Sequence, residues 1–102
     1  MTDDDKINDY IFYKITCLDA SKNLLYIGST TNFYNRQNQH INHINNWVSK
    51  KTYNLKLYKT IRDNGGWKNF IMEVLEKRKQ LTETEVTSIE QEYIVVLGAN
   101  MN

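Results

Sequence analysis

Residues 10–30 of the chain, YIFYKITCLDASKNLLYIGST, contain two runs of β-branched and aromatic residues on either side of a polar segment. Runs of this kind are typical of β-strands. We therefore expect strands over Tyr10–Cys17 and Leu24–Thr30, joined by a turn at Asp19–Asn23. Strands joined by so short a turn pair in the antiparallel sense, so this stretch predicts a β-hairpin.

The residues that follow the hairpin predict two helices. Asn32 is a suitable N-cap for a helix that runs to about Val48, because its side chain can accept a hydrogen bond from a free backbone N–H. A second helix is expected over Asn54–Asn64. It should end at Gly65-Gly66, since glycine readily follows the last turn of a helix.

A third strand and a last helix complete the predicted order. Alternating side chains predict a strand over Trp67–Glu76. Thr82-Glu83-Thr84-Glu85 forms a capping box that opens a helix to Leu97, with Gly98 after its end. The order is ββααβα. It predicts an α+β fold in which helices flank a three-stranded antiparallel sheet.

The length of 102 residues is enough for one domain. We expect this domain to span residues 9–102, after a disordered lead-in at residues 1–8. The lead-in is acidic and polar, which excludes a secretory signal peptide, and no stretch approaches the roughly 18 apolar residues of a membrane helix. Cys17 is the only cysteine, which favours a reducing, intracellular setting.

Positive charge is concentrated in the middle of the chain. Residues 31–70 carry seven basic side chains and one acid, a net charge of +6, whereas the whole chain carries +1. The basic residues there are Arg36, Lys50, Lys51, Lys56, Lys59, Arg62 and Lys68. Such a segment suits contact with phosphate groups, and Lys56 is a candidate for a substrate contact. The alternative is an ordinary solvated helix surface.

Glu90 interrupts the apolar pattern of the last predicted helix. At about 100° per residue, five apolar residues share one stripe: Val86, Ile89, Tyr93, Ile94 and Leu97. Glu90 falls near the middle of this stripe, and Glu92 falls on the solvated side. A carboxylate in an apolar setting is costly unless it is paired or binds a cation. Two explanations stay open: a structural salt bridge to a buried arginine, or a ligand for a divalent metal ion.

Other candidate side chains lie on the hairpin and on the first helix. Arg36 and His40 are four residues apart and therefore neighbours on one helix face. Arginine can hold a phosphate with two hydrogen bonds, and histidine can exchange protons near neutral pH; both can equally be surface residues. Tyr13 and Tyr26, one on each strand, are by themselves packing residues. We interpret the other aromatics, Tyr58 included, as core or cleft wall.

Taken in order, these features resemble the GIY-YIG nuclease superfamily. The first motif corresponds to Ile11-Phe12-Tyr13 and the second to Tyr26-Ile27-Gly28. The segment Asn32–His40 resembles the family's helix that carries an arginine and, four residues on, a histidine. Glu90–Ile94 resembles its Glu-x-x-aromatic-Ile motif, and the ending of the chain resembles its leucine-asparagine close, with Asn102 as the asparagine.

The resemblance covers Asp9–Asn102. Ile11 stands where the family usually has glycine, at a position that belongs to the strand rather than to the chemistry. Longer relatives carry further modules after the last motif, and none is expected here beyond Asn102.

The resemblance implies an endonuclease that hydrolyses phosphodiester bonds of DNA with one divalent cation. Glu90 would hold one Mg²⁺ or Mn²⁺, the hard cations that carboxylates and phosphates share. Arg36 would stabilise the transition state. Tyr13 would activate or position the attacking water, with Tyr26 and His40 assisting.

Two further residues complete the implied site: Gly28 would let the backbone approach it closely, and Asn102 would brace it by hydrogen bonding. Two alternatives to the nuclease are carried forward. One is a catalytically weak or inactive module that binds nucleic acid with the same fold. The other is a subunit that needs a partner protein for targeting.

Overall fold

The hairpin predicted over residues 10–30 is present in the computed structural model, which describes residues 6–102. Strands β1 (Asn8–Cys17) and β2 (Leu25–Thr30) pair antiparallel, with Tyr13 directly opposite Gly28. A short 3-10 turn, η2 (Ala20–Lys22), lies in the connection between them.

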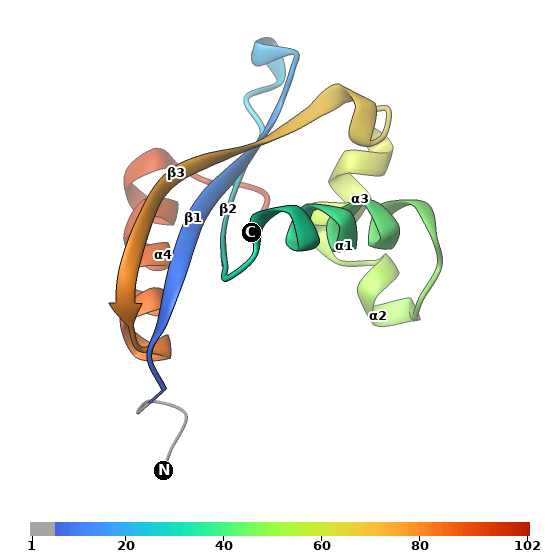
Figure 1. The fold of residues 1–102 in the computed structure, drawn as a ribbon. Coiled ribbons are helices and arrows are strands. Elements are labelled where there is room, and N and C mark those ends of the chain that lie inside the picture. Colours follow the sequence, from blue (N-terminus) through green and yellow to red (C-terminus); the bar gives the residue numbers. More distant parts are fainter. Residues whose placement is uncertain (1–5) are drawn as a thin grey trace.

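The remaining elements complete a three-stranded antiparallel sheet in the order β2-β1-β3, with helices on both sides (Figure 1). They are α1 (Phe33–Asn45), α2 (Lys50–Tyr53), α3 (Lys56–Asp63), η3 (Trp67–Asn69), β3 (Phe70–Leu81) and α4 (Glu83–Leu97). The predicted α+β class, with its antiparallel sheet flanked by helices, is confirmed.

The two faces of β1 bury two separate hydrophobic clusters, because successive side chains of a strand point to opposite faces. Tyr13 and Ile15 pack with residues of α1 and α3, Ile61 among them. On the other face, Phe12 packs against α4 through Val86. The helices α1–α3 and the helix α4 therefore lie on opposite sides of the sheet (Figure 1).

The predicted helix caps are present as local hydrogen bonds. The Asn32 side chain accepts from the Asn35 backbone N–H at 3.0 Å at the start of α1. The capping box of Thr82 and Glu85 opens α4, and Gly98 ends it with a left-handed φ of 69°. These signals use residues only a few positions apart, so they can form without help from the rest of the fold.

The boundaries of the first two predicted helices are wrong. α1 ends at Asn45 rather than near Val48, and Val48 is exposed. The expected helix over Asn54–Asn64 is two shorter ones, since α2 begins earlier, at Lys50, and α3 begins only at Lys56. The exposed side chains after Asn45 have no core to pack against, so tertiary packing does not extend α1.

The third strand begins and ends later than the sequence predicts. Residues Trp67–Asn69 form the 3-10 turn η3, and β3 continues beyond Glu76 to Leu81. The added residues are mostly exposed, and they stay in the sheet because they pair with the start of β1, where Asn8 is opposite Leu81. Backbone pairing therefore extends β3 where side-chain alternation gives no signal.

The expected lead-in over residues 1–8 overlaps the described structure only in part. Residues 1–5 lie outside the described residues, and Asn8 already belongs to β1. In residues 6–102, none of the helices has the length and apolar character needed to cross a lipid bilayer.

The chain end covers the outer edge of β2, which would otherwise leave backbone groups unpaired. The Asn102 side chain accepts from Ile27 N at 3.0 Å and donates to Ile27 O at 2.7 Å. Asn100 accepts from Leu25 N through its side chain at 2.9 Å, and its own N–H donates back to Leu25 O. Two asparagines thus replace a neighbouring strand beside Tyr26 and Gly28.

Candidate active site

A chain of hydrogen bonds buried between the sheet and the helices joins Tyr13, His40 and Tyr58. The Tyr13 hydroxyl and His40 Nε2 are 2.8 Å apart, and His40 Nδ1 and the Tyr58 hydroxyl are also 2.8 Å apart. Tyr13 comes from β1, His40 from α1 and Tyr58 from α3. Three elements that are separate in the sequence therefore meet at one imidazole.

His40 is completely buried, with an exposed fraction of 0%. Burial, followed by the charge of Arg36 and the proximity of His43, lowers the pKa of His40 to about 3. The imidazole is therefore neutral at physiological pH, with one nitrogen as donor and the other as acceptor. The alternative of an ordinary surface histidine is wrong for this residue.

Tyr26 completes the aromatic wall of the site. Its ring centroid lies 6.3 Å from that of Tyr13 and 6.0 Å from that of the His40 ring. Burial raises the pKa of both tyrosines, and Arg36 acts in the opposite direction on each. Both groups are therefore neutral phenols near pH 7. A tyrosine that acts as a base here needs a nearby positive charge and a route for its own proton.

Arg36 is the positive charge beside these phenols. It is half-buried, and its Nη1 donates to Gln39 Oε1 at 3.0 Å. Burial raises the pKa of Tyr13, and the charge and hydrogen bonding of Arg36 offset part of that rise. Although Arg36 and His40 are four residues apart on α1, only Arg36 reaches solvent. The guanidinium is therefore available to a ligand, whereas the imidazole is available only to its buried neighbours.

A cavity of about 190 Å³ opens beside the buried chain. Four predicted site residues line it, together with Tyr58 and apolar side chains; the four are Tyr26, Arg36, Lys56 and Asn102. Lys56 is exposed at the start of α3 and adds a second positive charge to that of Arg36. A cavity with two cations and two phenols suits a phosphate group, because each of these side chains can donate hydrogen bonds to its oxygens.

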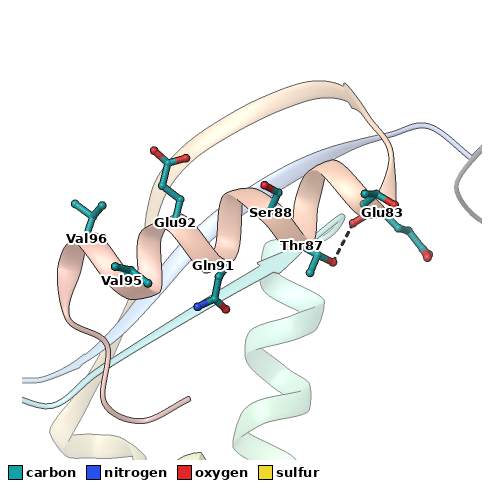
Figure 2. Close-up of a pocket in the computed structure, with 8 residues that line it drawn as sticks. Glu83, Thr87, Ser88, Gln91, Glu92, Val95 and Val96 are labelled. Atoms are coloured by element: carbon teal, nitrogen blue, oxygen red, sulfur yellow. Dashed lines mark hydrogen bonds between the residues drawn. The ribbon is translucent and has the colours of Figure 1, made fainter.

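A larger hollow of about 800 Å³ lies along one side of α4 (Figure 2). Its lining includes Glu92, Val95 and Val96, and none of the predicted site residues. This hollow has no histidine, tyrosine or basic side chain, and its two carboxylates, Glu83 and Glu92, would repel a phosphate group. We therefore assign the candidate site to the smaller cavity.

Glu90 is half-buried on α4, and Glu92 is exposed, as the helix geometry predicts. Ser29 Oγ on β2 donates a hydrogen bond to Glu90 Oε2. Burial is the main cause of the raised pKa of Tyr26, and the negative charge of Glu90 adds to it. In the described part of the chain no arginine or lysine forms an ion pair with Glu90. The alternative of a structural salt bridge thus finds no partner among residues 6–102.

The donor set around Glu90 fits a cation that keeps most of its water. Between residues 6 and 102, no group of three or more His, Cys, Asp and Glu side chains gathers as a metal cage. The Glu90 carboxylate uses Oε2 to accept from Ser29. A single carboxylate of this kind is compatible with Mg²⁺ or Mn²⁺, which bind through one or two carboxylates, waters and phosphate oxygens.

Two residues of this site were missed by the sequence interpretation. Tyr58 was assigned to core or cleft wall, yet its hydroxyl binds His40, and Ser29 was not considered, yet it binds Glu90. Neither has a local signal, because each partner is distant in the sequence. His43 is half-buried beside the Tyr58 ring, and the two ring centroids are 5.5 Å apart.

The basic residues of α2 and α3 do not all face the same environment. Lys50, Lys51 and Lys59 are exposed. The Arg62 guanidinium lies over the Tyr53 ring, 3.6 Å from its centroid, and donates to the Tyr53 carbonyl oxygen. Arg62 is therefore occupied within the fold, and the lysines carry the exposed positive charge of this surface.

Gly28 packs against the Tyr13 phenol. A Cβ atom added at Gly28 would overlap the Tyr13 Cζ and hydroxyl oxygen. The reason for glycine here is thus the space that Tyr13 occupies, since the φ angle of Gly28 is not in the left-handed region. Ile11 lies two residues before Tyr13 on β1 and pairs with Thr30 and Lys77.

We predict that Gly28→Ala destabilises the protein by about 1–3 kcal/mol, the usual cost of overpacking a buried position. It should also lower any catalytic rate that depends on Tyr13, because the phenol must move away from His40. Urea unfolding measures the first effect and a single-turnover assay the second. Unchanged stability and rate would contradict a fixed position for the Tyr13 ring.

Comparison with known proteins supplies one match. The family model described as the GIY-YIG catalytic domain matches residues 9–102. Searches of curated proteins and of solved structures find no significant match.

Proposed function

The chain belongs to the GIY-YIG catalytic-domain family, because the match spans nearly its whole length, and on this premise we propose that it is a metal-dependent endonuclease. In this proposal it hydrolyses phosphodiester bonds of DNA with one Mg²⁺ or Mn²⁺. The proposal rests above all on the contact of the buried pair Tyr13 and His40 with Tyr26 and Arg36, which line one small cavity.

The scissile phosphate is proposed to bind in the 190 Å³ cavity. Arg36 and Lys56, which line it, would neutralise the phosphate charge. The exposed Lys50, Lys51 and Lys59 would contact the neighbouring backbone of the nucleic acid. Such contacts give affinity without sequence recognition, so we expect binding that weakens strongly as the salt concentration rises.

Glu90 is the proposed metal ligand. Its support is the half-buried carboxylate that Ser29 orients and that no cation neutralises within residues 6–102. A bound divalent cation supplies a positive charge that stabilises negative charge developing on the phosphate. A hydrogen bond from Ser29 to one carboxylate oxygen restricts the rotation of the group, so the other oxygen is held in a defined direction.

Tyr13 is the proposed residue that positions and activates the attacking water. Its hydroxyl is a neutral phenol near pH 7, so it can take a proton from water only if its own proton leaves at the same time. His40 Nε2, 2.8 Å away, is the acceptor at hand. Arg36 favours this transfer, because its charge stabilises the phenolate that forms.

Arg36 and Tyr26 are proposed to act on the phosphate. In the pentavalent transition state the non-bridging oxygens carry more negative charge than in the substrate, and the guanidinium donates hydrogen bonds to them. The Tyr26 hydroxyl can donate a further hydrogen bond from the cavity wall. Asn102 acts indirectly, by holding the backbone of Ile27 next to Tyr26.

The test is incubation of the chain with supercoiled plasmid in the presence of Mg²⁺, Mn²⁺ or a chelator. We expect nicking with either metal and none with the chelator. A parallel incubation with single-stranded RNA tests the preference for DNA.

Binding without nicking under all metal conditions would refute the endonuclease and favour the nucleic-acid-binding module. Nicking that appears only when a cell extract is added would favour a subunit that depends on a partner. The cleavage assay therefore separates the proposal from both alternatives.

A further inference from the structure

Tyr58 connects the buried hydrogen-bond chain with the open cavity. Its side chain is only 3% exposed, and its hydroxyl lies 2.8 Å from His40 Nδ1. The same residue lines the 190 Å³ cavity beside Tyr26 and Arg36. Among the described residues, only Tyr58 both forms a hydrogen bond with His40 and lines this cavity.

The two phenols on His40 compete for a single acceptor. A neutral imidazole donates from one nitrogen and accepts at the other. One of Tyr13 and Tyr58 must therefore donate to His40, and the other must accept from it. Which of them donates determines the direction in which a proton can move along the chain.

The surroundings of the two hydroxyls favour Tyr13 as the donor. Tyr13 is 1% exposed, and beside it lie Arg36, which can only donate, and Tyr26, whose phenol oxygen is a weaker acceptor than an imidazole nitrogen. Tyr58 has the cavity, where water or a phosphate oxygen can accept its proton. Buried donors almost always have an acceptor. Every donor is paired, and Tyr13 keeps the stronger acceptor, if Tyr13 donates to His40 Nε2, His40 Nδ1–H donates to Tyr58, and Tyr58 donates into the cavity.

We propose that Tyr58 is a positioning residue that holds His40 in the Nδ1–H tautomer, so that Nε2 accepts the Tyr13 proton and the Tyr58 hydroxyl passes a proton on to the cavity. The catalytic role of Tyr58 rests on the proposed nuclease function, whereas the assignment of the His40 tautomer does not depend on it.

The proton transfer is balanced in each bond. The Tyr13 O–H bond breaks as an N–H bond forms at His40 Nε2, and the Nδ1–H bond breaks as a new O–H bond forms on Tyr58. The original Tyr58 proton leaves to a water in the cavity. His40 ends neutral in the other tautomer, and Tyr13 ends as a phenolate ready to accept a proton from the attacking water.

The groups around His40 favour a proton that passes through the imidazole over a proton that stays on it as an imidazolium. Titratable groups face it from every neighbouring element: Tyr13 from β1, Tyr26 from β2, Arg36 and His43 from α1, and Tyr58 from α3. Burial and the positive charge of Arg36 oppose an imidazolium. No imidazolium has to form if Nδ1 releases its proton to Tyr58 while Nε2 receives the proton of Tyr13.

The experiment reads the His40 tautomer by NMR, from the nitrogen and carbon shifts of its ring, in the wild type, Tyr58→Phe and Tyr13→Phe. We expect Nδ1–H in the wild type and in Tyr13→Phe. In Tyr58→Phe we expect a shift to Nε2–H, because the Nδ1 proton would lose its acceptor and a buried unpaired donor is costly.

The cleavage rate gives the second measurement. Under single-turnover conditions Tyr58→Phe should cleave plasmid at least about 10-fold more slowly, since it interrupts a proton path that contributes to acid–base catalysis. Tyr34→Phe, which removes an exposed hydroxyl from α1, is the matched control and should cleave at the wild-type rate.

Several results would overturn the proposal. These are an Nε2–H tautomer in the wild type, an unchanged tautomer in Tyr58→Phe, or a wild-type cleavage rate in that variant. If Tyr58→Phe does not fold, the tautomer of His40 in the wild type and in Tyr13→Phe still tests the proposal, which requires Nδ1–H in both. A wild type that never cleaves would refute the nuclease function alone, because the tautomer is measured without substrate.

Discussion

Glu90→Gln should abolish metal-dependent cleavage, with a loss of at least about 10³-fold in the single-turnover rate, the equivalent of several kcal/mol of metal-ion stabilisation. The amide keeps the size of the side chain and can still accept from Ser29, whose Oγ donates to Glu90 in the wild type. It cannot supply the negative charge that holds a divalent cation. The measurement is plasmid nicking across a range of Mg²⁺ and Mn²⁺ concentrations.

The same variant should fold normally and bind DNA. A half-buried carboxylate without an ion-pair partner in the described residues contributes little to stability and can even reduce it. We therefore expect a free energy of unfolding equal to that of the wild type or slightly higher. Urea unfolding measures this, and a filter or gel assay measures DNA binding.

Glu92→Gln is the matched control for Glu90→Gln. Glu92 lies two residues further along α4 and is exposed, so its loss should leave the rate unchanged within about twofold, as is usual for surface substitutions. Inactivity of Glu92→Gln together with normal cleavage by Glu90→Gln would show that the wrong carboxylate had been assigned.

Arg36→Ala should lower the single-turnover rate at saturating DNA by about 10²–10³-fold, the loss typical of one electrostatic donor in a transition state. Two effects combine in this variant. The phosphate loses a bidentate donor, and Tyr13 loses the positive charge that lowers its pKa. Arg36→Lys should recover only part of the rate, because an ammonium cannot make the two parallel hydrogen bonds of a guanidinium.

Lys51→Ala is the matched control for Arg36→Ala. It removes an exposed positive charge from α2, outside the cavity. We expect weaker DNA binding and a shallower dependence of affinity on salt, with an unchanged rate at saturation. If Arg36→Ala behaves in the same way, Arg36 contributes to affinity only and its role in the transition state is refuted.

The elements of this fold that could be predicted are those with local causes. The alternation in β1 and β2, the Asn32 cap and the capping box at Thr82 all depend on residues within a few positions of one another. The predicted end of a strand or helix is wrong where it depends on a partner that is distant in the sequence. β3 extends to Leu81 because β1 offers it a partner, and no property of residues 77–80 indicates that partner.

The candidate site divides in the same way. Helix geometry alone distinguished Glu90 from Glu92, because the two side chains point to different sides of one helix, and the structure has the first half-buried and the second exposed. The apolar stripe was less accurate at its end, since Leu97 is 44% exposed. Helix periodicity gives the direction of a side chain, whereas the extent of the neighbouring surface decides whether it is covered.

The sequence by itself determined the hairpin, the helix caps, the unusual carboxylate at Glu90 and the spacing of Arg36 and His40, because each depends on strand or helix periodicity. Only the tertiary structure decided that His40 is buried and neutral between two phenols, and that Ser29 orients Glu90. These contacts join residues 27, 18 and 61 positions apart. Contacts at such separations form only when the sheet and its helices pack together, so no local pattern encodes them.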